Sequence, residues 1–389
     1  MKIFRKIILL CLISTSISGQ NETKPIVING YLSGLQTIMF QKIDEEWTTE
    51  NLFHNRLNIN LYPIKNLTAS AQFRTRLIYG ETFKYYPGYT ERIGSDDGWL
   101  DLSFNISSGK SYVLNTSIDR LFVQYTVGHF ETTIGRQRIN WGQTYVWNTN
   151  DIFNTYSYFD IDYIERPGSD AIRLKYYTGY TSSVELAAKI DSSDKVTAAG
   201  LIHFSLLGYD IQFLCGVLSE GDYLAGIGWS GNILNAGFRG EATYFHDITS
   251  FRDTTGMIML STSLDYTFKN SLSLQGEFLY TNRPYVPAGG FLGYYTSPLN
   301  IKSLAFTEYS LFISLSYPFT PLFRGSFAGM YFPEMKGFFT GPSFTYNMME
   351  NIDLSLFLQY FSGEFENPLT SANTRENVMF SYLRLRWNF

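Results

Sequence analysis

The sequence predicts an all-β protein, a transmembrane antiparallel β-barrel of about 18 strands. Stretches of about 10 to 14 residues alternate apolar and polar side chains, as expected for strands with lipid on one face and water on the other. Aromatic residues make up 17% of the chain, yet the mean hydropathy is only -0.10. The rings are therefore spread among polar residues instead of being gathered in one continuous core. The last nine residues, SYLRLRWNF, alternate large apolar side chains with arginines up to the final phenylalanine.

The N-terminus has the three-part pattern of a secretory signal peptide. A basic start precedes an apolar run at 7–13, and a small, polar stretch follows it. We expect cleavage after Ser18 or Gly19. The chain would then divide into a signal peptide, residues 1–19, and an outer-membrane β-barrel, residues 20–389.

Cysteine usage and hydropathy limit the remaining choices. A lipid anchor at Cys11 is the alternative to cleavage, but Leu10 stands where a small residue is expected. Removal of the signal leaves Cys215 as the only thiol, so no intramolecular disulfide can form. Beyond the signal, no stretch approaches the roughly 18 apolar residues that a spanning helix needs. A membrane location therefore requires strands.

The alternation also predicts where the strands lie. Leu272 and Leu274, for example, alternate with Ser273 and Gln275. We expect strands near 26–40, 51–63, 66–80, 112–127, 130–140, 170–179, 183–191, 195–206, 209–218, 222–231, 234–246, 256–268, 271–282, 302–317, 321–333, 337–347, 351–362 and 376–389. A soluble β-sandwich is the structural alternative, but its strands are typically only about 5–6 residues long.

The connections between these strands fall into two classes. Those after even-numbered strands are short and turn-like, whereas those after odd-numbered strands vary in length. Four of the second class are long: 81–111, 140–169, 247–255 and 283–301. This asymmetry is typical of an outer-membrane barrel with short periplasmic turns and longer outer loops.

The final strand resembles the C-terminal assembly signal of bacterial outer-membrane proteins. Leu385, Trp387 and Phe389 occupy the alternate positions that this signal gives to large apolar residues. The resemblance implies that the barrel-assembly machinery recognises this strand and that outer-membrane lipid surrounds the folded barrel.

Charged side chains predict which face of each strand points inward, because an Arg or Lys facing lipid at the midplane costs about 2–4 kcal/mol. This rule also turns Ile134 inward. It predicts a basic wall on neighbouring strands, composed of Arg56, Arg74, Arg76, Arg120, Arg136, Arg138, Arg173 and Lys175. The opposite wall is richer in inward acids, namely Glu241, Asp265, Glu277, Glu308 and Asp353. These inward charges have two interpretations. In the first, ion pairs between arginines and acids simply stabilise the wall of a water-filled lumen. In the second, a basic wall with few acids among its members concentrates anions in the pore.

The connection 140–169 is the most informative loop, because about 30 residues is long for a loop and it is rich in rings and carboxylates. Such rings would not be left in water. We expect the loop to fold into the barrel, to place its carboxylates against the basic wall and to narrow the pore. The candidate constriction residues are Trp141, Trp147, Asp151, Tyr158, Asp160, Asp162 and Glu165. The rings have two readings, simple packing or a track on which sugars stack.

Three short motifs around this loop resemble a segment found in 18-stranded outer-membrane channels, including porins of the alginate-export type. The motifs are IGRQRINWG, WNTNDIFN and ERPGSDAIRL, all within 134–174. The resemblance implies a porin-like channel for passive diffusion of small solutes, with an arginine-lined lumen that prefers anions or anionic saccharides.

Other functional classes find less support. The net charge of -5 and the lack of a basic block argue against nucleic-acid binding. No His, Cys and carboxylate cluster has metal-ligand spacing, and we expect neither a metal nor a cofactor. We expect no enzyme activity, since no Gly-x-Ser-x-Gly motif occurs and His246 beside Asp247 is the one suggestive pair. A structural or adhesive barrel and, more remotely, an outer-membrane hydrolase remain alternatives, and the sequence leaves the oligomeric state open.

Overall fold

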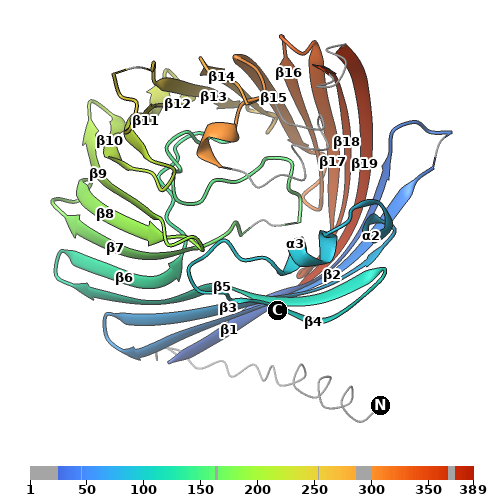
Figure 1. The fold of residues 1–389 in the computed structure, drawn as a ribbon, viewed down its shortest axis with the longest axis horizontal. Coiled ribbons are helices and arrows are strands. Elements are labelled where there is room, and N and C mark those ends of the chain that lie inside the picture. The colour runs from blue at the N-terminus through green and yellow to red at the C-terminus, as the bar shows by residue number, and fades with distance from the viewer. Residues whose placement is uncertain (1–24, 45, 163–164, 253, 286–299, 367–372) are drawn as a thin grey trace.

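The computed structural model describes residues 25–389, apart from 45, 163–164, 253, 286–299 and 367–372. The predicted signal peptide, residues 1–19, lies outside the described residues. The described strands form one antiparallel sheet that closes on itself, because β1 pairs with both β2 and β19 (Figure 1). The strands are β1 (Ile26–Phe40), β2 (Thr48–Ile64), β3 (Leu67–Gly80), β4 (Ser103–Gly109), β5 (Tyr112–Val127), β6 (Phe130–Gln137), β7 (Ser169–Tyr177), β8 (Ser183–Ile190), β9 (Val196–Leu206), β10 (Tyr209–Val217), β11 (Asp222–Ile233), β12 (Ala236–Asp247), β13 (Met257–Thr267), β14 (Ser273–Thr281), β15 (Tyr309–Pro318), β16 (Phe323–Phe332), β17 (Gly337–Met349), β18 (Ile352–Glu366) and β19 (Asn373–Asn388).

The sheet has 19 strands, and all except β4 form the closed ring in sequence order. The predicted 18-stranded barrel is therefore confirmed. The short strand β4 lies within the predicted loop 81–111. The sequence did not predict it, because its residues, SFNISSG, are mostly polar. It pairs with the outer part of β5, beyond the point where β6 ends. The predicted strand 302–317 begins later, at Tyr309, because Ile301–Ser303 forms the short 3-10 helix η1.

The outside of the ring is apolar. Leu121, Val123 and Tyr125 of β5 are all exposed on this surface, whereas Gln124 between them points inward. The same alternation recurs on the other strands, which leaves a belt of exposed aliphatic and aromatic side chains around the barrel. A surface of this kind requires lipid around it.

Two irregularities break the alternation on the basic side of the ring. The inward position predicted for Ile134 is wrong, because this side chain is 54% exposed on the outer surface while Arg136 is only 6% exposed. Gly135 between them has φ +113°, a conformation that a residue with a Cβ rarely adopts. In β5, a register shift against β3 similarly turns Asp119 and Arg120 inward together.

The segment between β6 and β7, residues 138–168, crosses the inside of the ring (Figure 1). The predicted inward fold of this loop is confirmed. Two short helices, α2 (Thr82–Tyr85) and α3 (Tyr89–Gly94), follow β3, and α3 also lies inside the ring. None of the described helices is long and apolar enough to cross a membrane.

Candidate functional site

The inward loop is held on one side by Glu241 of β12. Its carboxylate accepts hydrogen bonds from the backbone N–H groups of Gln143, Thr144 (2.8 Å) and Asn150 (2.7 Å). The Thr144 hydroxyl donates to it as well, at 3.2 Å. The Glu241 side chain is fully buried and accepts all four of these hydrogen bonds from the loop.

Glu277 of β14 holds the loop in the same way, through hydrogen bonds from its backbone. The backbone N–H groups of three consecutive residues, Tyr145, Val146 and Trp147, donate to its two oxygens at 2.7 to 3.2 Å. Successive N–H groups that converge in this way form a natural anion-binding concavity. Asp265 of β13 adds a third contact by accepting from the Tyr145 hydroxyl at 2.9 Å.

These contacts reverse part of the sequence prediction. We expected carboxylates of the loop to meet a basic wall, whereas here carboxylates of the wall hold the backbone of the loop. Glu241 and Glu277 were recognised as inward acids, but their function as loop anchors has no signal in a single sequence. It depends on which segment of a distant loop reaches them.

The predicted ring residues of the loop pack against one another and against the wall. Trp141 is buried edge-on to Phe153, with ring centroids 5.0 Å apart, and its Nε1 donates to Glu185. Trp147 and Tyr158 both lie edge-on to Phe312 of β15. Buried rings in this arrangement support the packing reading over the sugar-stacking track.

The far end of the loop meets the opposite side of the ring. Asp162 contacts His54 of β2 at 3.2 Å, and Glu165 lies 3.9 Å from Arg56. Burial alone would raise the pKa of Asp162, but the bond to His54 and nearby arginines lower it overall. The Glu165 carboxylate also accepts from the Tyr31 hydroxyl at 3.1 Å. Here the predicted contact between loop carboxylates and the basic wall is present.

The other two predicted loop carboxylates behave differently. Asp160 accepts a hydrogen bond from the backbone N–H of Asp162 at 3.1 Å. Asp151 is fully buried, and neither of its carboxylate oxygens has a hydrogen-bond partner among the described residues. This burial raises the pKa of Asp151 to about 7.

The predicted basic wall contains more acids than the sequence suggested. Asp119 binds Arg56 at 2.7 Å and Arg74 at 3.5 Å. Glu185 of β8 binds Arg173 at 3.1 Å and Lys175 at 2.7 Å. The expectation of few acids among these basic residues is therefore wrong, because irregular register and neighbouring strands bring acids to the same face.

The remaining basic residues of the predicted wall donate mainly to neutral side chains or to backbone carbonyl oxygens. Arg76 donates to the Asn115 side chain at 3.0 Å, and Arg120 donates to the carbonyl oxygens of Glu165 and Arg166. Arg138 is partly buried, and its Nε has no hydrogen-bond partner in the part of the chain that the structure describes. Arg136 is bracketed by two aspartates, described below.

Comparisons with known proteins identify the fold. No protein-family model and no curated protein matches the sequence. Solved structures do match: OccK7 (OpdD) of Pseudomonas aeruginosa has a TM-score of 0.59 and 9% identity, covering 94% of this chain and 99% of that one. OccAB2 of Acinetobacter baumannii has a TM-score of 0.56 and 11% identity, covering 93% and 98%. OccK8 (OprE) of Pseudomonas aeruginosa has a TM-score of 0.57 and 8% identity, covering 94% and 98%.

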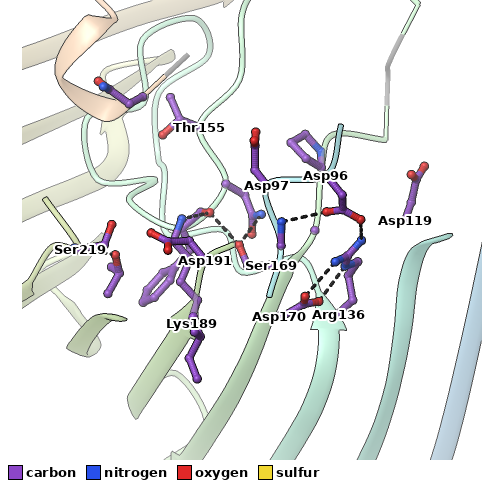
Figure 2. Close-up of a pocket in the computed structure, with 18 of the residues that line it drawn as sticks. Asp96, Asp97, Asp119, Arg136, Thr155, Ser169, Asp170, Lys189, Asp191 and Ser219 are labelled. Atoms are coloured by element: carbon purple, nitrogen blue, oxygen red, sulfur yellow. Dashed lines mark hydrogen bonds and ion pairs between the residues drawn. The ribbon is translucent and has the colours of Figure 1, made fainter. Parts of the chain in front are cut away.

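The chain has the fold of an outer-membrane porin. Within this porin fold, two cavities lie beside the inward loop. One, of about 380 Å³, is lined by Asp97, Lys189 and Asp191 among others (Figure 2). The other, of about 440 Å³, has a more apolar lining that includes Ile78 and Phe380. Arg74 and Arg76 line both, which makes them the basic residues best placed to meet a solute.

Further basic residues of the barrel lumen were not named in the sequence prediction of the basic wall. Lys189 of β8 donates to the Phe153 carbonyl of the loop at 2.9 Å. Arg384 and Arg386 of the last strand also reach inward, Arg384 to the Ile161 carbonyl and Arg386 to Asp353. Their alternation in SYLRLRWNF was the available signal.

The predicted assembly strand has the expected parity in the barrel. Leu385, Trp387 and Phe389 are all exposed on the outer surface. Phe389 and Gly30 exchange backbone hydrogen bonds at 2.9 and 3.0 Å, which helps to close the ring between β19 and β1. Among the described residues, no group of three or more His, Cys, Asp or Glu could hold a metal ion.

Proposed function

We propose that this barrel is a porin-like outer-membrane channel for passive diffusion of small solutes, constricted by residues 138–168. The observation that carries the proposal is the loop itself: it crosses the lumen and is held to both sides of the wall. A loop anchored in this way narrows the lumen while leaving cavities beside it. The fold shared with the Occ porins supports the same conclusion.

We further propose that the channel prefers anions or anionic saccharides. Arg56 and Arg74 share Asp119, and Arg74 and Arg76 line both cavities beside the loop, where a solute would pass. Arg76 also donates to the neutral side chain of Asn115. A low-dielectric wall concentrates the field of such a group and attracts anions to it.

The reversal potential of single channels in a salt gradient tests this preference. The wild-type protein should favour anions, and Arg74→Ala with Arg76→Ala should reduce the preference several-fold. Arg324→Ala, an exposed arginine of β16 that lines neither cavity, is the matched control and should leave it unchanged. Cation preference that the double variant does not alter would remove the anion proposal.

We also propose two partners of the barrel: outer-membrane lipid and, through β19, the barrel-assembly machinery. The outward parity of Leu385, Trp387 and Phe389 supports recognition of this strand. The second candidate function, a structural or adhesive barrel, predicts a closed lumen. Liposome swelling separates the two, since small neutral and anionic sugars should enter liposomes that contain the channel.

A further inference from the structure

Two strands of the ring, one on each side of β7, are too short to cover a membrane alone. β6 and β8 have only eight residues each. At about 3.3 Å per residue and a tilt of about 40°, eight residues rise roughly 18 Å, whereas the apolar band of such barrels is about 25 Å tall. Something else must complete the outer wall here.

The segment that precedes β4 lies directly beyond these short strands. Gly98 forms a β-bridge with Asp191 at the outer end of β8. The backbone N–H of Leu100 donates to Asp170 at the start of β7, and the Leu102 carbonyl accepts from Ile118 of β5. Residues 98–102 therefore run from β8 across the ends of β7 and β6 to β5.

The region carries four large apolar side chains that are exposed. Trp99 is 55% exposed, Leu100 45%, Phe104 52% and Ile106 62%. Asn105, between the last two, points inward and bonds to the buried Asn115. Phe104 and Asn105 follow the alternation of a lipid-facing strand, and the register against β5 shifts between Asn105 and Ser107, where Ile106 lies. The region belongs to the predicted loop 81–111.

Arg136 fastens the segment to the ring (Figure 2). Its guanidinium binds Asp170 of β7 through two hydrogen bonds of 2.7 and 2.8 Å and Asp96 at 2.6 Å. It also donates to the Leu100 carbonyl at 2.6 Å, which leaves the Leu100 side chain on the outer side. One buried cation thus ties β6, β7 and the segment together.

We propose that residues 98–109 form a membrane-embedded part of the barrel wall, covered on the outside by lipid acyl chains, and that Arg136 is the positioning residue that holds it there. Continuity with the outer surface argues for lipid as the occupant. Ile134, Ile172 and Leu186, on the short strands just below, are all more than half exposed on the same face. Trp99, Leu100, Phe104 and Ile106 extend this apolar band beyond the outer ends of β6, β7 and β8.

Spin labels on single cysteines in liposomes test the proposal, on a Cys215→Ser background. The label positions are Ile106→Cys, with Ile134→Cys as the lipid-facing reference and Ser193→Cys, in the exposed turn after β8, as the aqueous reference. The label at 106 should collide with oxygen, which partitions into lipid, in preference to a water-soluble nickel complex. It should resemble the label at 134 and differ several-fold from that at 193.

Other outcomes are distinct. A water-like label at 106 beside a lipid-like label at 134 would overturn the proposal and leave the barrel intact. Labels shielded from both reagents and broadened by a second spin would show another copy of the chain on this face, which also overturns lipid as the occupant. Water-like labels at both 106 and 134 would instead contradict the membrane barrel on which the proposal rests.

The role of Arg136 needs a second variant. Arg136→Gln should make the label at 106 several-fold more accessible to nickel while the label at 134 stays unchanged. Arg173→Gln, which removes another ion-paired arginine of the wall, is the control. Heat-modifiable migration on gels confirms that each variant folds, and unchanged accessibility at 106 in a folded Arg136→Gln barrel would refute the positioning role.

Discussion

At the residue scale, single groups decide local structure against the pattern of the strand. Gly135 allows β6 to present Ile134 to the outside and Arg136 to the inside, although both have the same parity in the sequence. Asp151 is the opposite case, an ionisable residue buried in the loop, and none of the residues that the structure describes donates a hydrogen bond to its oxygens. Burial of this kind favours the neutral form of the carboxyl group.

This burial predicts a specific pH dependence of stability. The folded pKa of Asp151 is about 7, above its ordinary value of 3.8, so the folded state binds the proton more tightly than the unfolded state. Its contribution to stability is present at low pH and is lost as the pH rises towards 7. At pH 8, Asp151→Asn should therefore raise the free energy of unfolding by the order of a few kcal/mol.

Urea unfolding of the detergent-refolded barrel at two pH values measures this effect. At pH 4, where the aspartate is protonated, the variant and the wild-type protein should unfold at the same urea concentration. Equal midpoints at pH 8 as well would show that the carboxylate is solvated in the folded protein.

At the scale of elements, the loop and the wall are joined by charge and backbone geometry. Glu241 and Glu277 stand on β12 and β14, and each accepts N–H groups from one short stretch of the loop, residues 143–150. A hydrogen bond to a charged acceptor contributes about 1.5–3 kcal/mol, so several such bonds hold the loop firmly. Replacing the carboxylate by an amide turns one acceptor into a donor that faces other donors.

Glu241→Gln and Glu277→Gln should each loosen the constriction. We expect increased open-channel noise and a single-channel conductance changed by about twofold or more in the double variant, because the loop leaves its position on β12 and β14. Asp353→Asn is the matched control, since it removes an inward carboxylate that pairs with Arg386. If Asp353→Asn changes the noise and conductance to the same extent, the cause is loss of charge in the lumen and not release of the loop.

At the scale of the whole molecule, one rule organises the chain: outward side chains meet hydrocarbon and inward side chains meet water or the loop. The two faces therefore respond oppositely to the same substitution. An added lysine on the lipid face costs up to about 4 kcal/mol at the midplane, whereas lumen positions tolerate charge.

A pair of variants on adjacent strands measures this asymmetry. Ile134→Lys should lower the free energy of unfolding by roughly 2–4 kcal/mol. Gln124→Lys, on β5 with its side chain inward, should change it by less than about 1 kcal/mol. Equal losses, measured by urea titration in liposomes, would contradict the outward position of Ile134.

The sequence by itself determined the barrel, its strand number and the inward course of the long loop. Alternation of side chains is local, and lipid on one face makes it obligatory, so period and parity can be read directly. The final strand is an example, with Leu385 and Trp387 outside and Arg384 and Arg386 inside. Most strand boundaries followed within a few residues for the same reason, except that the strand predicted from residue 302 begins at Tyr309.

Only the tertiary structure decided which charges meet. Ion pairs such as Arg56 with Asp119, and the hold of Glu241 and Glu277 on the loop, join residues far apart in the chain. Their geometry depends on strand register, on the irregularities at Gly135 and Asp119, and on the path of the loop across the lumen. The tertiary structure also decided the position of residues 98–109. Their exposed apolar side chains can be interpreted as part of the wall only because the segment lies at the outer ends of the short strands β6 and β8.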